Sequence, residues 1–227
     1  MTGSNGPLFV TGTPGAGKTL LGATLAKTLG CRVVSQAVLL ERLGLLGPPD
    51  PESGSREVDE ETAGDAVTKA LFRGDDDDFV FEGHLTGLVP LDRWALVVVL
   101  RAHPAALRER LRERGYSPEK VDENVQAEVL GVVAGEVAEQ VESLRRRGGT
   151  ARVPLVLELD ATDADPDELA RAVREVLVAG EVPPAVRLGT VNWLDSLFRE
   201  GTLYDFLPLE PFPPGGDGGG EGEDSNG

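Results

Sequence analysis

The stretch Gly12-Thr13-Pro14-Gly15-Ala16-Gly17-Lys18-Thr19 decides the fold of this 227-residue chain. It fits the pattern G-x-x-x-x-G-K-[ST] of the phosphate-binding P-loop, with no position out of place. The glycines allow a tight turn whose backbone N–H groups face a phosphate chain. Lys18 can reach the β- and γ-phosphates of a nucleotide, and the Thr19 hydroxyl can hold Mg²⁺. The apolar run at residues 8–11 and the helical pattern at residues 17–29 predict the strand–loop–helix context that a working P-loop needs.

The composition favours one α/β domain with small insertions. Hydrophobic residues make up 40% of the chain and aromatic residues 5%, so we expect a core built mainly from Val, Leu and Ala. No apolar run approaches the roughly 18 residues of a membrane span, and no secretory signal is seen at the N-terminus. Cys31, the single cysteine, excludes an intramolecular disulfide and agrees with a reducing cytosol. We therefore expect a cytoplasmic protein with no membrane partner.

The formal net charge of −17 disfavours direct binding to nucleic acid. Two explanations of this charge remain open. A strongly solvated acidic surface keeps proteins soluble at high salt, and the count of 4 lysines against 18 arginines fits that explanation, which we prefer. A basic partner, such as a ribosomal protein, would also be attracted.

Along the rest of the chain, short apolar runs alternate with stretches of helical periodicity. Strands are predicted at residues 8–11, 32–34, 79–81, 95–100 and 155–159, and helices at 17–29, 36–43, 58–72, 104–114, 118–147 and 167–179. This alternation predicts a parallel sheet flanked by helices. The long stretch 118–147 contains a possible break near residues 131–135, and Thr162 or Asp165 is a plausible cap for the last helix. Residues 208–227, rich in Pro, Gly and acidic residues, are expected to form a disordered tail.

Glu82-Gly83-His84 follows the third predicted strand. P-loop folds hold the metal ion through water with a carboxylate at the end of a strand that neighbours the P-loop strand, which makes Glu82 the candidate. His84 can orient or deprotonate a water or a hydroxyl. The alternative is a turn whose side chains are satisfied locally; the P-loop favours a functional role.

The predicted helix at residues 104–114 carries two pairs of arginines spaced four apart, Arg108 with Arg112 and Arg110 with Arg114. Arginines that close over a γ-phosphate stabilise charge during phosphoryl transfer. The alternative is a solvated basic face paired with neighbouring glutamates. Spacing does not decide between the two.

Taken together, these features resemble the adenylate kinase isoenzyme 6 family, including its archaeal members described as broad-specificity adenylate kinases. The P-loop wording GTPGxGKT and the acidic-x-His element after the third strand are typical of that family. Further matches are Leu100-Arg101, Glu109-Arg110-Leu111, Arg114-Gly115-Tyr116, Glu123-Asn124-Val125-Gln126-Ala127-Glu128 and Val191-Asn192-Trp193-Leu194. The resemblance covers about residues 7–207.

The resemblance implies a nucleoside-monophosphate-kinase fold with five parallel strands in a single domain at residues 1–207. It also implies a nucleoside-monophosphate (NMP) insert at about residues 35–58 and a lid at about residues 114–124. The implied reaction is ATP + AMP ⇌ 2 ADP with Mg²⁺, accompanied by slow ATP hydrolysis. An alternative function is that of an ATPase that binds a basic small-subunit ribosomal protein during ribosome maturation.

The resemblance also implies roles for individual residues. The residues expected to bind ATP are Gly15, Ala16, Gly17, Lys18, Thr19 and Arg114. The catalytic set is Lys18, Glu82, His84, Arg110 and Arg114, and Mg²⁺ is expected on Thr19 and, through water, on Glu82.

The sequence differs from the family pattern at two points. Glu82 stands where the family usually has Asp, and the extra methylene moves the carboxylate by about 1–1.5 Å. An arginine expected in the first helix of the NMP insert aligns on Glu41. Arg42 beside it is therefore the candidate residue for the acceptor AMP.

Overall fold

The computed structural model describes residues 6–49, 56–73, 78–149 and 152–207. Its centre is a five-stranded parallel sheet with the strand order β2-β3-β1-β4-β5. The strands are β1 (Leu8–Gly12), β2 (Arg32–Ser35), β3 (Phe79–Glu82), β4 (Leu96–Arg101) and β5 (Leu155–Asp160). The predicted five-stranded parallel sheet is confirmed, with the P-loop strand β1 at its middle.

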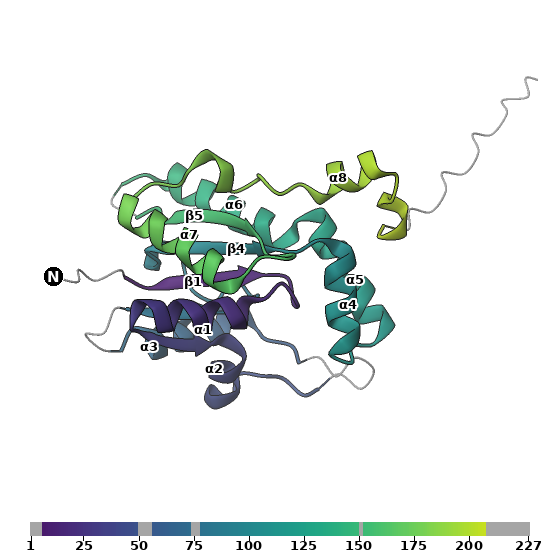
Figure 1. Ribbon diagram of the computed structural model, residues 1–227. Helices are drawn as coiled ribbons and strands as arrows, with labels where there is room; N and C mark the ends of the chain where they lie inside the picture. The colour runs from purple at the N-terminus through teal and green to yellow at the C-terminus, as the bar shows by residue number, and fades with distance from the viewer. Residues whose placement is uncertain (1–5, 50–55, 74–77, 150–151, 208–227) are drawn as a thin grey trace, which may run out of the picture.

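Helices cover both faces of the sheet. They are α1 (Lys18–Leu29), α2 (Gln36–Leu43), α3 (Glu60–Leu71), α4 (Pro104–Glu113), α5 (Pro118–Leu130), α6 (Val132–Arg147), α7 (Pro166–Ala179) and α8 (Trp193–Glu200). In Figure 1, α1 and α7 lie on one face of the sheet and α3 and α6 on the other, while α4 and α5 stand at the end towards which the strands point. No helix in the described ranges has both the length and the apolar character needed to cross a membrane.

The alternation of side chains along β1 divides the core into two clusters. Leu8 and Val10 face α1 and α7, whereas Phe9 faces α3 and α6. Complete burial of each such side chain contributes roughly 1.5–3 kcal/mol. The strands are apolar on both faces because both are covered.

One of the two clusters departs from the composition-based expectation. Val, Leu and Ala make up most of the cluster under α1 and α7, as predicted. The other cluster contains an aromatic group formed by Phe9, Phe72, Phe79 and Phe81 around Trp94, with ring centroids 5.3–5.9 Å from that of Trp94. Five of the chain's aromatic residues are thus concentrated at one place.

Several element boundaries differ from the predicted ones for local reasons. The possible break predicted within residues 118–147 is found at Gly131, where φ is 66° and α5 ends, so this stretch forms two helices. Helix α3 begins at Glu60, since the Asp59 side chain accepts hydrogen bonds from the N–H groups of Glu61 and Thr62. Helix α7 is capped by Asp165, one of the two predicted caps. The periodicity did not indicate α8, and the expected tail at residues 208–227 lies outside the described residues.

Strand β1 ends at Gly12, where β4 lies too close for a side chain. A Cβ atom at Gly12, where φ is 144°, would lie 2.3 Å from the Leu100 carbonyl oxygen. The backbone of β4 and the first turn of the P-loop therefore lie in direct contact, and this contact fixes where the P-loop leaves the sheet.

We expect Gly12→Ala to lower the melting temperature by roughly 4–8 °C, because the Cβ collides with backbone and φ is unfavourable for alanine. Gly135→Ala is the matched control, since a Cβ at this position in α6 meets no atom within 4 Å. Alanine also favours a helix over glycine, so the control should keep or raise the melting temperature. Equal melting of Gly12→Ala and the parent in a calorimetric scan would contradict the contact.

Candidate functional site

The P-loop wraps around the ammonium group of Lys18. Lys18 is 9% exposed, and its Nζ donates hydrogen bonds to the carbonyl oxygens of Gly12 at 2.9 Å and Thr13 at 3.0 Å. Burial lowers the pKa of Lys18 to about 8; Glu82 and Glu128 oppose this shift, and Arg114 adds to it. A phosphate chain would add further negative charge beside this buried cation.

Thr19 and Glu82 form a pair of oxygen groups beside Lys18. Glu82 ends β3 and is buried, and the Thr19 Oγ1 donates a hydrogen bond to its Oε2 at 3.2 Å. Within the described ranges no three acidic, His or Cys side chains gather as a metal cluster. The Thr19–Glu82 pair fits Mg²⁺, a cation that takes one or two protein oxygens and completes its shell with water and phosphate.

The loop after β3 is held by Gln36, the first residue of α2. Gln36 is buried; its Nε2 donates to the Leu85 carbonyl, and its Oε1 accepts from the N–H groups of His84 and Leu85. A side chain at Gly83 would collide with Gln36, since the nearest approach would be 2.4 Å. These contacts fix the backbone that presents His84.

His84 is neutral at physiological pH. The atoms packed around the ring, and secondarily the charges of Lys18 and Lys120, lower its pKa to about 4. His84 is nevertheless an exposed residue, and it lines a cavity. A neutral imidazole in this place can accept a proton or a hydrogen bond.

Two cavities meet at the P-loop. We call them the apolar cavity, of about 600 Å³, and the polar cavity, of about 710 Å³. Both are lined by Gly15, Lys18, Thr19 and Arg114. The apolar cavity runs between α1 and α7, and its further lining includes Leu20, Ala23, Ala164, Pro166 and Leu169. The polar cavity runs towards α2, and its further lining includes Gln36, Arg56, Glu82, His84 and Tyr116.

The four arginines at residues 108–114 divide between the two alternatives that the sequence left open. Arg110 and Arg114 belong to the site. Arg114 lines both cavities, and Arg110 donates hydrogen bonds to the carbonyls of Gly15 at 3.5 Å and Ala161 at 3.1 Å, and to that of Thr162. Arg108 lies over the Phe206 ring, and the exposed Arg112 pairs with Glu109. The first pair therefore borders the P-loop, and the second faces away from it.

Arg42, which the sequence predicts to bind the acceptor AMP, does not lie with the other predicted site residues. It lines a separate cavity with Arg32 and Arg73. The reason is its phase on α2: Leu40 faces the polar cavity, and two residues further the helix has turned by about 200°. Arg56 lies in the polar cavity instead. It follows residues 50–55, and a β-bridge between Pro49 and Arg56 positions it.

Comparison with known proteins gives concordant results. Residues 8–131 match the family model described as an AAA domain. The protein named "Putative adenylate kinase" of Pyrococcus furiosus is 36% identical over 82% of this chain and 90% of its own length. Proteins of the same name from Halobacterium salinarum and Natronomonas pharaonis are 38% and 39% identical, over 82% and 83% of this chain and 96% and 98% of theirs.

A solved structure shows the same fold. Shikimate kinase from Acinetobacter baumannii in complex with shikimate superposes with a TM-score of 0.52 at 14% identity, over 78% of this chain and 96% of that one. At this level of identity the similarity concerns the fold.

The lowered pKa of Lys18 predicts how ATP affinity depends on pH. The free protein loses the Lys18 charge as the pH rises through about 8. A phosphate chain favours the charged form, so the affinity for ATP should fall by up to tenfold per pH unit above that value. Calorimetric titrations between pH 7.5 and 9.5 measure this. Lys18→Arg keeps its charge over the range, so its affinity, whatever its absolute value, should stay flat; a flat parent profile would contradict the prediction.

Proposed function

The chain belongs to the adenylate kinase isoenzyme 6 family with its archaeal adenylate kinases, and from this premise we propose that it transfers the γ-phosphate of ATP to AMP. A P-loop phosphotransferase needs one site for the donor and one for the acceptor. The observation that carries the proposal is that two cavities meet at Lys18, Thr19 and Arg114. The transferred phosphoryl group would lie at this junction.

The apolar cavity suits the donor. Its lining of Leu20, Pro166 and Leu169 offers an apolar surface to a base, and the triphosphate would run along the P-loop towards Lys18. Arg110 borders the same cavity and holds Gly15 through its carbonyl. In this proposal Arg110 shapes the P-loop, and Arg114 contacts the phosphates.

The polar cavity suits the acceptor monophosphate. Arg56 offers a guanidinium for the α-phosphate of AMP, and Tyr116 lies in the same lining. An oxygen of that phosphate attacks the γ-phosphorus of ATP, the bond from the γ-phosphorus to the bridging oxygen breaks, and two ADP molecules result. Lys18 and Arg114 stabilise the charge that develops on the γ-phosphoryl group during its transfer.

Glu82 and His84 complete the proposed machinery. Mg²⁺ would be held by the Thr19 hydroxyl and, through water, by Glu82; when bound, it neutralises charge on the β- and γ-phosphates. The longer Glu82 side chain accepts a hydrogen bond from the Thr19 hydroxyl, and this contact supports its proposed role beside Mg²⁺. Neutral His84 orients the attacking phosphate oxygen by donating its ring N–H to it.

A second candidate function uses the same residues. Water can take the place of the acceptor phosphate, with His84 orienting it, which gives ATP hydrolysis. The net charge of −17 favours a basic partner for such an ATPase, such as a small-subunit ribosomal protein. Recovery of a ribosomal protein in an ATP-dependent pull-down, together with ATP turnover that is indifferent to AMP, would favour this function over the kinase.

We expect AMP to stimulate ADP formation from Mg·ATP well above the rate without acceptor. The measurement is turnover against a panel of nucleoside monophosphates with a no-acceptor control, at low and high salt. Salt is varied because the acidic chain repels itself when its charges are poorly screened. If no monophosphate raised turnover above the hydrolysis background at any salt concentration, the kinase proposal would be wrong.

Arg56 and Arg42 offer a matched pair for testing the acceptor side. Arg56→Ala should raise the KM for AMP at least roughly tenfold, since a charged hydrogen bond of about 1.5–3 kcal/mol is lost. Arg42→Ala removes the same side chain from a separate cavity and should change that KM less than twofold. The KM for ATP should stay unchanged in both variants. The reverse pattern would return the acceptor role to Arg42.

A further inference from the structure

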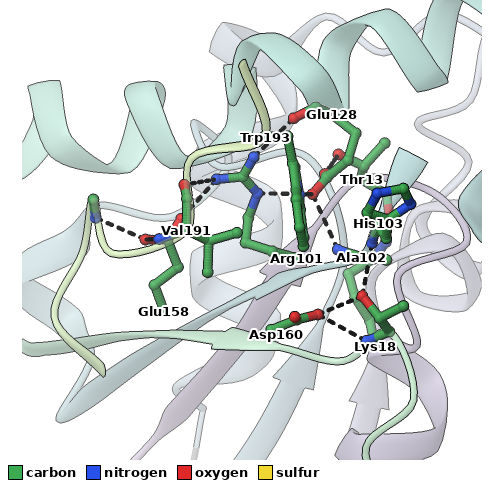
Figure 2. Close-up of polar contacts among 12 residues, drawn as sticks. Thr13, Lys18, Arg101, Ala102, His103, Glu128, Glu158, Asp160, Val191 and Trp193 are labelled. Atoms are coloured by element: carbon green, nitrogen blue, oxygen red, sulfur yellow. Dashed lines mark hydrogen bonds and ion pairs between the residues drawn. The ribbon is translucent and has the colours of Figure 1, made fainter. Parts of the chain in front are cut away.

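A buried carboxylate that lines neither of the two cavities is hydrogen-bonded to the P-loop. Glu128, on α5, is 1% exposed, and its Oε2 accepts a hydrogen bond of 2.5 Å from the Thr13 hydroxyl in the P-loop. Thr13 is itself 2% exposed. Figure 2 shows the two side chains pointing towards one another.

The second oxygen of Glu128 joins the P-loop to distant parts of the chain. Its Oε1 accepts from Arg101 Nε at 2.8 Å, from the Ala102 N–H at 3.0 Å and from Trp193 Nε1 at 3.0 Å. All the groups around this carboxylate are donors, which suits an ionised Glu and no neutral side chain of similar shape. Because these donors share one buried carboxylate, the loss of any one of them changes the strength of the hydrogen bonds that the others make to it.

Arg101 continues the network to the C-terminal segment. Its NH1 donates to Glu158 Oε1 at 2.7 Å and to the Val191 carbonyl at 3.2 Å. Glu158 Oε2 accepts from the N–H groups of Gly189 and Val191. Burial opposes the guanidinium charge, but the attraction and hydrogen bonds of Glu128 and Glu158 outweigh it and raise the pKa of Arg101. The segment that begins at Gly189 and includes α8 is therefore bound to the P-loop through two buried carboxylates (Figure 2).

Thr13 contacts both Lys18, which would bind the nucleotide, and the hydrogen-bond network of Glu128. Its carbonyl accepts a hydrogen bond from Lys18 at 3.0 Å, while its hydroxyl donates to Glu128. Phosphates that bind the P-loop compete for the Lys18 ammonium and so change the bonding of the Thr13 peptide. The Thr13 hydroxyl is hydrogen-bonded to Glu128, and Glu128 accepts the indole N–H of Trp193, so a change at Thr13 can reach Trp193 through these two bonds.

We propose that Glu128 is a positioning residue that couples nucleotide occupancy of the P-loop, through the Thr13 hydroxyl, to Trp193 and the C-terminal segment. The proposal rests on the proposed function only in requiring that the P-loop bind ATP. A purely structural network would stabilise the fold without responding to ATP. The coupling is reciprocal, so a change at Trp193 must alter ATP affinity.

The chain offers its own reference for a spectroscopic test. It has two tryptophans, Trp94 and Trp193. Trp94 precedes β4, at the opposite end of the strand from Arg101, and lies in the aromatic group on the far side of the sheet from α1. The ¹⁵N–¹H spectrum should therefore contain two indole signals, of which only that of Trp193 responds to ATP. Trp193→Phe identifies its signal.

The experiment titrates a non-hydrolysable ATP analogue with Mg²⁺ into the parent, Thr13→Val and Thr13→Ser proteins, with calorimetry to measure binding independently. The Trp193 indole signal should shift in the parent, stay in place in Thr13→Val when the site is saturated, and shift again in Thr13→Ser, which restores the hydroxyl. The dissociation constant should rise roughly fivefold in Thr13→Val. A shift of equal size in Thr13→Val would overturn the proposal.

A double-mutant cycle supplies the reciprocal test. Trp193→Phe should weaken binding of the analogue in the parent, but have no further effect in the Thr13→Val background, because both changes break one path. Independent, multiplicative effects would overturn the coupling. If the parent bound the analogue while the Trp193 signal stayed fixed, the coupling alone would fail. If calorimetry detected no binding to a folded parent, the proposed function would fail and the inference with it.

Discussion

A buried ammonium group between two cavities is the constraint on which the rest of the structure depends. Lys18 has lost most of its hydration, and its hydrogen bonds end on two backbone carbonyls of the loop that surrounds it. Such a group is costly in an apolar interior unless negative charge is near. Glu82 and Glu128 supply that charge from two directions, and Arg114 opposes it from the junction of the cavities. The site is therefore poised to take up a further anionic group.

The parallel sheet makes this arrangement possible. Strands β1, β3 and β4 are neighbours, and their carboxyl ends bring the P-loop, Glu82 and Arg101 to one edge. The close contact of Gly12 with β4 sets the start of the loop, and Gln36 sets the loop that follows β3. These two contacts position the P-loop and the loop after β3 before any ligand binds. Such preorganisation is the condition for efficient electrostatic stabilisation.

The parts of the site that could be predicted from the sequence are local. The P-loop is contiguous, and Glu82 and His84 follow a readable strand, so spacing and residue type located them. The contact of Thr13 with Glu128 joins residues 115 positions apart, and that of Gln36 with His84 joins residues 48 apart. No periodicity encodes such pairs. The family motif at residues 123–128 includes Glu128 but does not reveal its partner in the P-loop.

Helical phase explains the other difference. Adjacency to an aligned position predicts Arg42, but one step along a helix turns a side chain by about 100°. The structure places it in another cavity and brings Arg56 into the polar one. The central claim is that the two cavities hold the two nucleotides and that their phosphates meet at Lys18 and Arg114. A crystal structure with a bisubstrate analogue, two adenosines joined by five phosphates, tests it most directly. The account predicts one adenosine beside Leu169, the other beside Tyr116, and the phosphates across Lys18 and Arg114. Both adenosines outside these cavities, or a phosphate chain away from Lys18, would contradict it.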